Sequence, residues 1–157
     1  MSIRRAEIKD IGRINDLLFQ VLDVHHAGRP DLFKGNVKKY TDSELREIVC
    51  DDGRPIFVYT DEKDEVIGYA FCALIQHKND NILTDIKTLY VDDLCVDEKQ
   101  RGKHIGTSLC DHVVNYAKEQ NCHNVTLNVW ACNEGAMRFY EKCGLKPYKT
   151  GMEILLK

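Results

Sequence analysis

The sequence predicts a mixed α+β fold, in which one sheet carries helices on both of its faces. Three strand-like segments, 56–60, 66–76 and 86–96, follow one another without an intervening helix, so we expect them to pair antiparallel. A strand–helix–strand run comes next, and that order favours a parallel pair. Because 157 residues can bury one core without cross-links, we expect a single domain over 1–157.

The N-terminal third predicts one edge strand and two helices. Residues 2–8 alternate in polarity as a strand does, and Asp10 precedes apolar residues at helical spacing, as a helix cap would. The segment 25–36 contains Gly, Pro and Asn, so we expect a loop there. A second helix is expected after a cap at Thr41 or Ser43.

The centre of the chain predicts a hairpin and a third long strand. The segments 56–60 and 66–76 flank a polar turn, which is typical of a β-hairpin. The strand 86–96 contains the adjacent acids Asp92 and Asp93. Alternation along a strand places these two side chains on opposite faces of the sheet.

The C-terminal third predicts two helices and two strands. Helical spacing resumes at Ile105, and 124–129 has the pattern of a short buried strand. Asn133 is expected to cap the last helix and Gly144 to end it. Residues 152–157 are expected to form a closing strand, so the order becomes β-α-α-β-β-β-α-β-α-β.

Composition excludes several classes of protein. The net charge of −3 does not favour a nucleic-acid partner, and no apolar run reaches the length of a membrane span. Seven cysteines at wide spacings, without a CxxC pair, argue against a disulfide framework or a zinc site. We therefore expect reduced thiols, no bound metal and, since no signal-like stretch opens the chain, a cytoplasmic location.

The stretch "VDEKQRGKHIGTSL", residues 96–109, joins a strand to a helix. The first amides of a helix lack internal partners, and the helix dipole is positive at that end. Glycines let another group approach the backbone closely, and Arg101 and Lys103 add positive charge. These features predict a phosphate or pyrophosphate cradle. The P-loop and dinucleotide-binding glycine patterns are absent, which disfavours those two nucleotide classes.

This stretch resembles the acetyl-coenzyme A loop of the GNAT superfamily of N-acetyltransferases. The family pattern is Gln/Arg-x-x-Gly-x-Gly/Ala, and here Arg101 and Gly106 match its ends, while His104 occupies the usual glycine position. A second stretch, 128–147, resembles the later family pattern Asn-x-x-Ala-x-x-Phe-Tyr-x-x-x-Gly-Phe. The matching residues are Asn133, Ala136, Phe139, Tyr140 and Gly144, with Leu145 in place of the final Phe.

The resemblance implies a GNAT-like acyl-CoA N-acyltransferase fold, with a mostly antiparallel sheet splayed between its fourth and fifth strands. The pantetheine arm of acetyl-CoA then inserts at the splay. The implied cofactor-binding residues come from the strand, the loop and the last helix. They are Leu94, Cys95, Val96, Arg101, Gly102, Lys103, His104, Ile105, Gly106, Thr107, Asn133, Ala136 and Tyr140.

The resemblance also implies direct transfer of acetyl to an amine in a ternary complex. Tyr140 stands at the family's position for the acid that protonates the leaving thiolate, and its usual pKa of about 10 is near the thiol's, about 8.5. "LYVDDLCV" is similar to a stretch of polyamine acetyltransferases, which points to Asp92 for handling the amine. His25, His26 and Tyr90, with Asp92, are the expected substrate contacts, and a histidine could instead be the base.

Two functions follow from these observations. The first is an acetyl-CoA-dependent N-acetyltransferase acting on a primary amine of a small molecule or a peptide, with no metal, nucleic-acid or membrane partner and a possible homodimer. The alternative is a non-catalytic acyl-CoA-binding or sensor domain on the same fold. His104 favours the alternative, because its side chain departs from the loop pattern, whereas Tyr140 and the acids favour catalysis.

Overall fold

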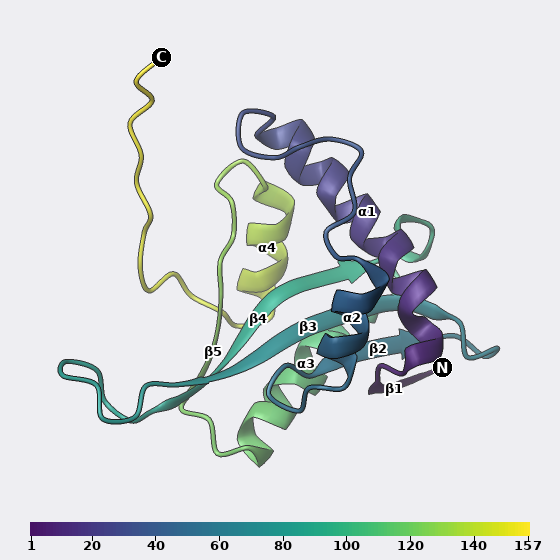
Figure 1. Ribbon diagram of the computed structural model, residues 1–157, viewed down its shortest axis with the longest axis horizontal. Helices are drawn as coiled ribbons and strands as arrows, with labels where there is room; N and C mark the ends of the chain where they lie inside the picture. The colour runs from purple at the N-terminus through teal and green to yellow at the C-terminus, as the bar shows by residue number, and fades with distance from the viewer.

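The computed structural model describes all residues, 1–157, and contains one five-stranded sheet in the order β1-β2-β3-β4-β5 (Figure 1). The strands β1 to β4 pair antiparallel, and β4 pairs with β5 in parallel. The predicted mixed α+β fold is therefore confirmed. The elements in chain order are β1 (Ser2–Arg5), η1 (Ile8–Asp10), α1 (Ile11–Gly28), α2 (Asp42–Val49), β2 (Ile56–Thr60), β3 (Val66–Gln76), β4 (Lys87–Val96), η2 (Glu98–Gln100), α3 (Ile105–Glu119), β5 (Asn124–Leu127) and α4 (Glu134–Lys142).

The helices divide between the two faces of the sheet, as the sequence predicts. On one face, α1 and α2 cover a core built around Ile14, Leu17, Leu45 and Tyr69, all fully buried. On the other face, α3 packs Leu109 and its neighbours against β2, β3, β4 and β5. Figure 1 shows α3 behind the sheet and α1 with α2 in front of it.

Helix ends form largely where the sequence places their caps. Thr41 accepts a hydrogen bond from the Glu44 amide, and Asn133 accepts one from the Ala136 amide, so both caps are confirmed. Gly144 has a φ of 91°, the left-handed conformation that a glycine adopts readily after a helix. Asp10 also precedes α1, but its carboxylate accepts from the Glu7 amide and from Arg4, not from α1.

The loop predicted over 25–36 begins later than expected. The helix α1 continues to Gly28, so His25 and His26 lie on its last turn. Neither histidine breaks a helix, and the sequence offers no breaker before Gly28 and Pro30. The helix therefore carries His25 toward the start of α4, where Gly28 meets Cys132, whereas His26 faces the loop after α1.

The prediction of a closing strand over 152–157 is wrong. No residue after α4 belongs to a helix or strand, and the chain runs away from the sheet (Figure 1). Met152, Ile154 and Leu156 are 94%, 83% and 90% exposed. The strand-like pattern is present, but no strand of the same chain pairs with it.

No helix of the chain combines the length and the apolar composition that crossing a lipid bilayer requires.

Candidate active site

The strands β4 and β5 pair over only part of β4. Their register joins Thr88–Val91 to Asn124–Leu127 and stops there, so Asp92–Val96 has no strand on the β5 side. The Asp97 amide donates to the Ile67 carbonyl of the β3 side at 2.9 Å. Since amides alternate along an antiparallel ladder, those of Leu94 and Val96 point toward the open edge.

This alternation decides which amides of the implied cofactor residues Leu94, Cys95 and Val96 can reach a bound group. The Cys95 amide points toward β3, so Leu94 and Val96, rather than Cys95, present N–H groups at the divergence of β4 and β5. The Cys95 thiol is buried on the α1 side, with Sγ 3.8 Å from the Leu17 carbonyl oxygen. Burial raises the pKa of this thiol to about 12, so it is not a thiolate at neutral pH.

The loop before α3 has the backbone shape of a glycine-rich turn. His104 adopts a φ of 59° and Gly102 a φ of 80°, both in the left-handed region. His104 is the N-cap of α3, yet no side chain caps the first amides of the helix. Arg101 and Lys103 are exposed beside them. The His104 side chain is also exposed, and the loop retains free amides and positive charge at the helix start.

The two stretches that resemble family patterns touch each other at Gly106. A Cβ added to Gly106 would lie 3.1 Å from Cζ of Phe139, which is closer than a real Cβ normally comes. Phe139 belongs to α4 and Gly106 to the first turn of α3. The missing side chain therefore lets α4 pack against the start of α3.

Tyr140 lies on α4, next to Phe139, with ring centroids 5.1 Å apart. Burial raises the pKa of Tyr140, and the negative charge of Asp93 raises it further. Its hydroxyl has no hydrogen-bond partner in the chain, and it is not an unsatisfied buried atom either. Asn133 and Ala136 lie one to two turns earlier, where the Asn133 side chain caps the helix. The Tyr140 hydroxyl is therefore protonated at neutral pH and free to bond a group that enters beside α4.

A β-bulge re-aims the acidic pair of β4. Phe71 pairs with Asp93, and Cys72 pairs with Val91, so Asp92 is the extra residue. The expectation that the two acids face opposite sides is wrong, because the bulge interrupts the alternation. Both carboxylates act on the same cation, Lys39, whose pKa they raise although burial lowers it.

Asp93 is the more enclosed of the two acids. The Tyr69 hydroxyl donates to Asp93 Oδ2 at 2.7 Å from within the core. Burial raises the pKa of Asp93, while the Tyr69 bond and the charges of Lys39 and His25 oppose that rise. Asp92 is exposed and accepts from Lys39 Nζ at 3.0 Å. Asp93 is thus a carboxylate with a raised pKa that lies near Tyr140.

A pocket of about 240 Å³ lies beside the bulge, on the α2 side of the sheet. Tyr40 and Phe71 stack there with centroids 6.0 Å apart, and Tyr90 and Asp92 complete the wall. The Tyr90 hydroxyl accepts from the Asn128 side-chain amide at 3.2 Å. Of the expected substrate contacts, Tyr90 and Asp92 line this pocket.

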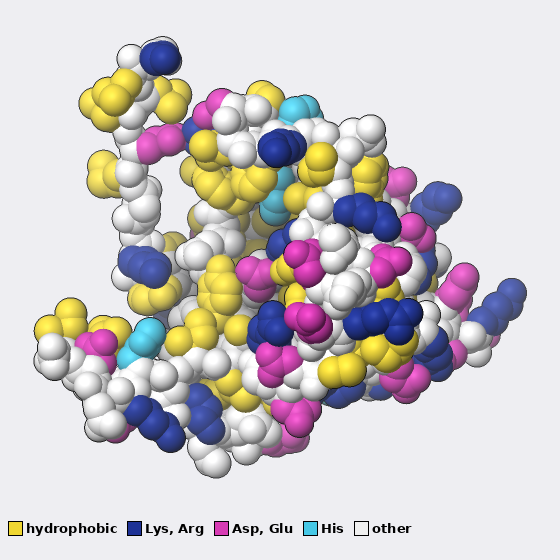
Figure 2. Space-filling view, viewed as in Figure 1, with side chains coloured by type: hydrophobic (Ala, Val, Ile, Leu, Met, Phe, Trp, Pro, Cys, Tyr) yellow, Lys and Arg dark blue, Asp and Glu magenta, His cyan; other side chains and the backbone are white.

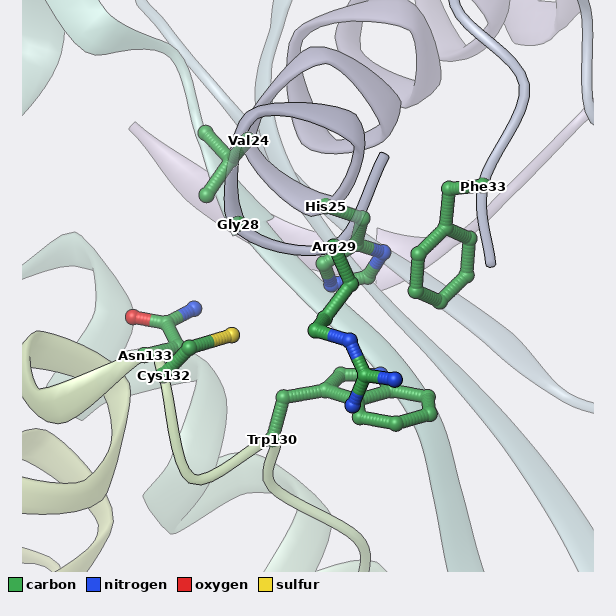
Figure 3. Close-up of a pocket in the computed structure, with 8 residues that line it drawn as sticks. All are labelled: Val24, His25, Gly28, Arg29, Phe33, Trp130, Cys132 and Asn133. Carbon is green, nitrogen blue, oxygen red and sulfur yellow. The ribbon is translucent and has the colours of Figure 1, made fainter. Parts of the chain in front are cut away.

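The other two expected contacts, His25 and His26, have different surroundings. His25 lines a pocket of about 70 Å³ between the end of α1 and the start of α4, where it faces Phe33, with centroids 5.1 Å apart (Figure 3). His26 Nδ1 lies 2.7 Å from the Phe33 carbonyl oxygen, and its ring packs on Gly35. His26 therefore holds the loop after α1 in place.

The sequence patterns do not indicate Tyr69 or Lys39 as members of the site, and they favour Asp92 over Asp93 as the acid that handles the amine. Tyr69 resembles any core aromatic residue in sequence, and only the fold directs its hydroxyl at Asp93. The bulge that exposes Asp92 and encloses Asp93 carries no glycine or proline that would have indicated it. No three His, Cys, Asp or Glu side chains gather in a group that could hold a metal ion.

Comparison with known proteins shows that most of the chain matches one protein family. The sequence profile described as "Acetyltransferase (GNAT) family" matches residues 22–145. The chain is 32% identical to glucosamine 6-phosphate N-acetyltransferase from Arabidopsis thaliana over 59 residues. These residues are 38% of this chain and 38% of that one. It is 32% identical over 81 residues to N-alpha-acetyltransferase 30 from Xenopus laevis, 52% of this chain and 28% of that one. The chain thus spans less than half the length of these curated relatives.

A solved structure is similar over the full length. A mutant of the BH1408 protein from Bacillus halodurans is 30% identical, covers 100% of both chains and superimposes with a TM-score of 0.95.

Proposed function

Because this chain belongs to the GNAT acetyltransferase family, we propose that it transfers the acetyl group of acetyl-CoA to a primary amine in a ternary complex. The acceptor is an amine of a small molecule or a peptide. The observation that carries the proposal is the divergence of β4 and β5. The uncapped start of α3 follows β4 along the chain, and the charge of Asp93 acts on Tyr140.

The residues at this divergence fit acetyl-CoA as a substrate. The first amides of α3, with Arg101 and Lys103 beside them, suit a pyrophosphate, since helix N-termini and basic side chains both attract anions. The amides of Leu94 and Val96 suit the polar groups of an extended pantetheine arm and the thioester oxygen. The other loop residues implied to bind the cofactor, together with Asn133 and Ala136 of the α4 start, would line the space that the pantetheine arm enters.

The acceptor amine must lose its proton before it can attack. A lysine-like amine has a pKa of about 10.4, so the neutral form at pH 7 costs roughly 4 to 5 kcal/mol. Asp93 is suited to receive that proton, directly or through water, because burial raises its pKa. Asp92, paired with Lys39 at the pocket wall, then serves to attract a cationic acceptor. Tyr140 supplies a proton to the departing coenzyme A thiolate.

The chemistry of the pocket narrows the class of acceptor. Its walls combine the aromatic rings of Tyr40, Phe71 and Tyr90 with the carboxylate of Asp92. Arg54 also lines the pocket, and its charge is paired with Asp51. Aromatic rings and carboxylates both favour cations. Amino sugars and peptide amines enter as candidates because curated relatives are named for glucosamine 6-phosphate and for N-alpha acetylation.

The experiment is a thiol-release assay with acetyl-CoA against polyamines, aminoglycosides, amino sugars and their phosphates, amino acids and short peptides. We expect turnover on one amine class. Tyr140→Phe should lower kcat by about 100-fold or more while acetyl-CoA still binds, because only proton transfer is lost. Acetyl-CoA binding without turnover on every class would favour the non-catalytic sensor instead.

A further inference from the structure

Lys39 lies in the connection between α1 and α2, residues 29–41, which contains no helix or strand. Its Nζ lies 3.0 Å from Asp92 Oδ2 and 5.4 Å from the centre of the Tyr40 ring. Although burial lowers the pKa of Lys39, the charges of Asp93 and Asp92 raise it by more. Lys39 is therefore an ammonium group that two carboxylates and an aromatic ring hold at the β4 bulge.

The groups around Lys39 are those that the proposed function gives to the acceptor amine. Asp92 attracts that amine, Asp93 receives its proton, and the pocket beside them has aromatic walls. Lys39 is itself a primary amine that is a cation at neutral pH. The free protein therefore holds an ammonium of its own where the ammonium of the acceptor is expected.

Lys39 is the cation that decides whether Asp92 is free to bind another one. A paired carboxylate attracts a second cation only weakly, because the first cation cancels most of its charge. The other cation of the pocket, Arg54, is engaged elsewhere, with its Nε 2.6 Å from Asp51 Oδ2. Figure 2 shows acidic and basic side chains interspersed over the face that α1 and α2 form, so a cation that approaches this face meets charges of both signs.

The pair between Lys39 and Asp92 can open without disturbing the core. The two side chains are 31% and 41% exposed, and Asp92 is the extra residue of the bulge. Ion pairs with this much exposure contribute little to stability, so an incoming cation can replace one of the partners. Asp93 keeps a second anchor when Lys39 leaves, because the Tyr69 hydroxyl donates to it from the core.

We propose that Lys39 occupies the position of the acceptor's ammonium in the free protein, and that a cationic acceptor displaces it on binding. Its role as a competitor rests on the proposed function, because only an amine-acetylating site has an acceptor to exclude. Lys39 is then a specificity-determining residue. It lowers the affinity of the site for a primary alkylammonium by the fraction of time that it occupies Asp92.

The test follows the amide chemical shifts of Asp92 and Asp93 by NMR while butylamine, a cation at neutral pH, is added without acetyl-CoA. Lys39→Met should lower the dissociation constant of butylammonium at least about fivefold, because no tethered cation has to leave first. Lys39→Arg should stay within about twofold of wild type, since a guanidinium also pairs with a carboxylate. In the thiol-release assay, the KM of a cationic acceptor should fall in Lys39→Met by a similar factor.

Lys38→Met is the matched control, since it removes the same charge from the adjacent residue. Lys38 pairs with Asp42 instead, with its Nζ 3.6 Å from Asp42 Oδ1. Binding of butylammonium to Lys38→Met should match wild type. A gain confined to Lys39→Met therefore separates competition for Asp92 from a change in net charge.

Three results would overturn the competition. An unchanged or weaker affinity in Lys39→Met means that Lys39 helps to build the site and does not compete for it. Equal gains in Lys38→Met and Lys39→Met mean that net charge is responsible. No binding by any of these proteins means that the acid pair is not a cation site. Because acetyl-CoA is absent, a protein without transferase activity still gives a dissociation constant, so this test fails separately from the proposed function.

Discussion

At the scale of single residues, two opposing effects act on Asp93. Burial raises its pKa, and the hydrogen bond from Tyr69 lowers it, with burial the stronger. A base must be deprotonated to accept a proton, so its pKa sets the pH above which the enzyme works. The midpoint of the acidic limb of the pH–rate profile therefore reports the pKa of Asp93 as it is set by burial and by the Tyr69 hydrogen bond.

Tyr69→Phe should shift that limb to higher pH. The substitution keeps the ring in the core but removes the donor that stabilises the carboxylate, so the pKa of Asp93 rises further. The midpoint of kcat/KM against pH should move upward, while the rate at high pH stays near wild type. Comparing both proteins with one amine cancels the titration of the amine itself.

Asp93→Asn should remove the limb and lower kcat by about 100-fold or more. Asp92→Asn is the matched control on the adjacent residue, and it should raise KM for a cationic acceptor and leave the limb in place. A limb that follows Asp92 and ignores Asp93 would contradict the assignment and restore Asp92 as the base, as the sequence suggested.

The backbone of His104 is strained, because its φ of 59° lies in the left-handed region. A side chain in the left-handed region costs roughly 1–2 kcal/mol, which glycine avoids. His104→Gly should therefore raise the free energy of unfolding by about 1 kcal/mol, measured by chemical denaturation. His104→Ala keeps the strain and should show no such gain; equal gains in both variants would place the cause in the imidazole instead.

At the scale of elements, the start of α3 depends on α4. Gly106→Ala would bring its Cβ to 3.1 Å from Phe139, so α4 must shift by a few tenths of an ångström. Since α4 carries Asn133 and Tyr140, we expect at least about tenfold weaker acetyl-CoA binding, measured by calorimetry. Gly135→Ala is the control, because its nearest neighbour, Asn133 Oδ1, lies at 3.9 Å. Its binding should match wild type.

Elements with strong local signals could be predicted from the sequence, and elements set by distant contacts could not. Helical spacing and the caps Thr41 and Asn133 are local, and the structure confirms them. The bulge at Asp92 arises from pairing with β3, so no pattern within β4 indicates it. Short motifs in the sequence indicate the candidate site, and Tyr69, a core residue of β3, lies outside these motifs.

At the scale of the whole molecule, the chain combines a well-packed half with an open half. The strands β1 to β4 lie between α1, α2 and α3 and contain most of the buried residues. The half formed by β5, α4 and residues 146–157 has none. By our proposal, the substrates would cover part of this half.

The most direct test of the central claim is calorimetric titration of acetyl-CoA into wild type and Arg101→Ala at low and high salt. We predict saturable binding of one acetyl-CoA per chain, weakened in Arg101→Ala and by salt, because a charged loop and the start of α3 would hold the pyrophosphate. Heat of binding that is absent from wild type would contradict the account, since the divergence of β4 and β5 would then not be an acetyl-CoA site.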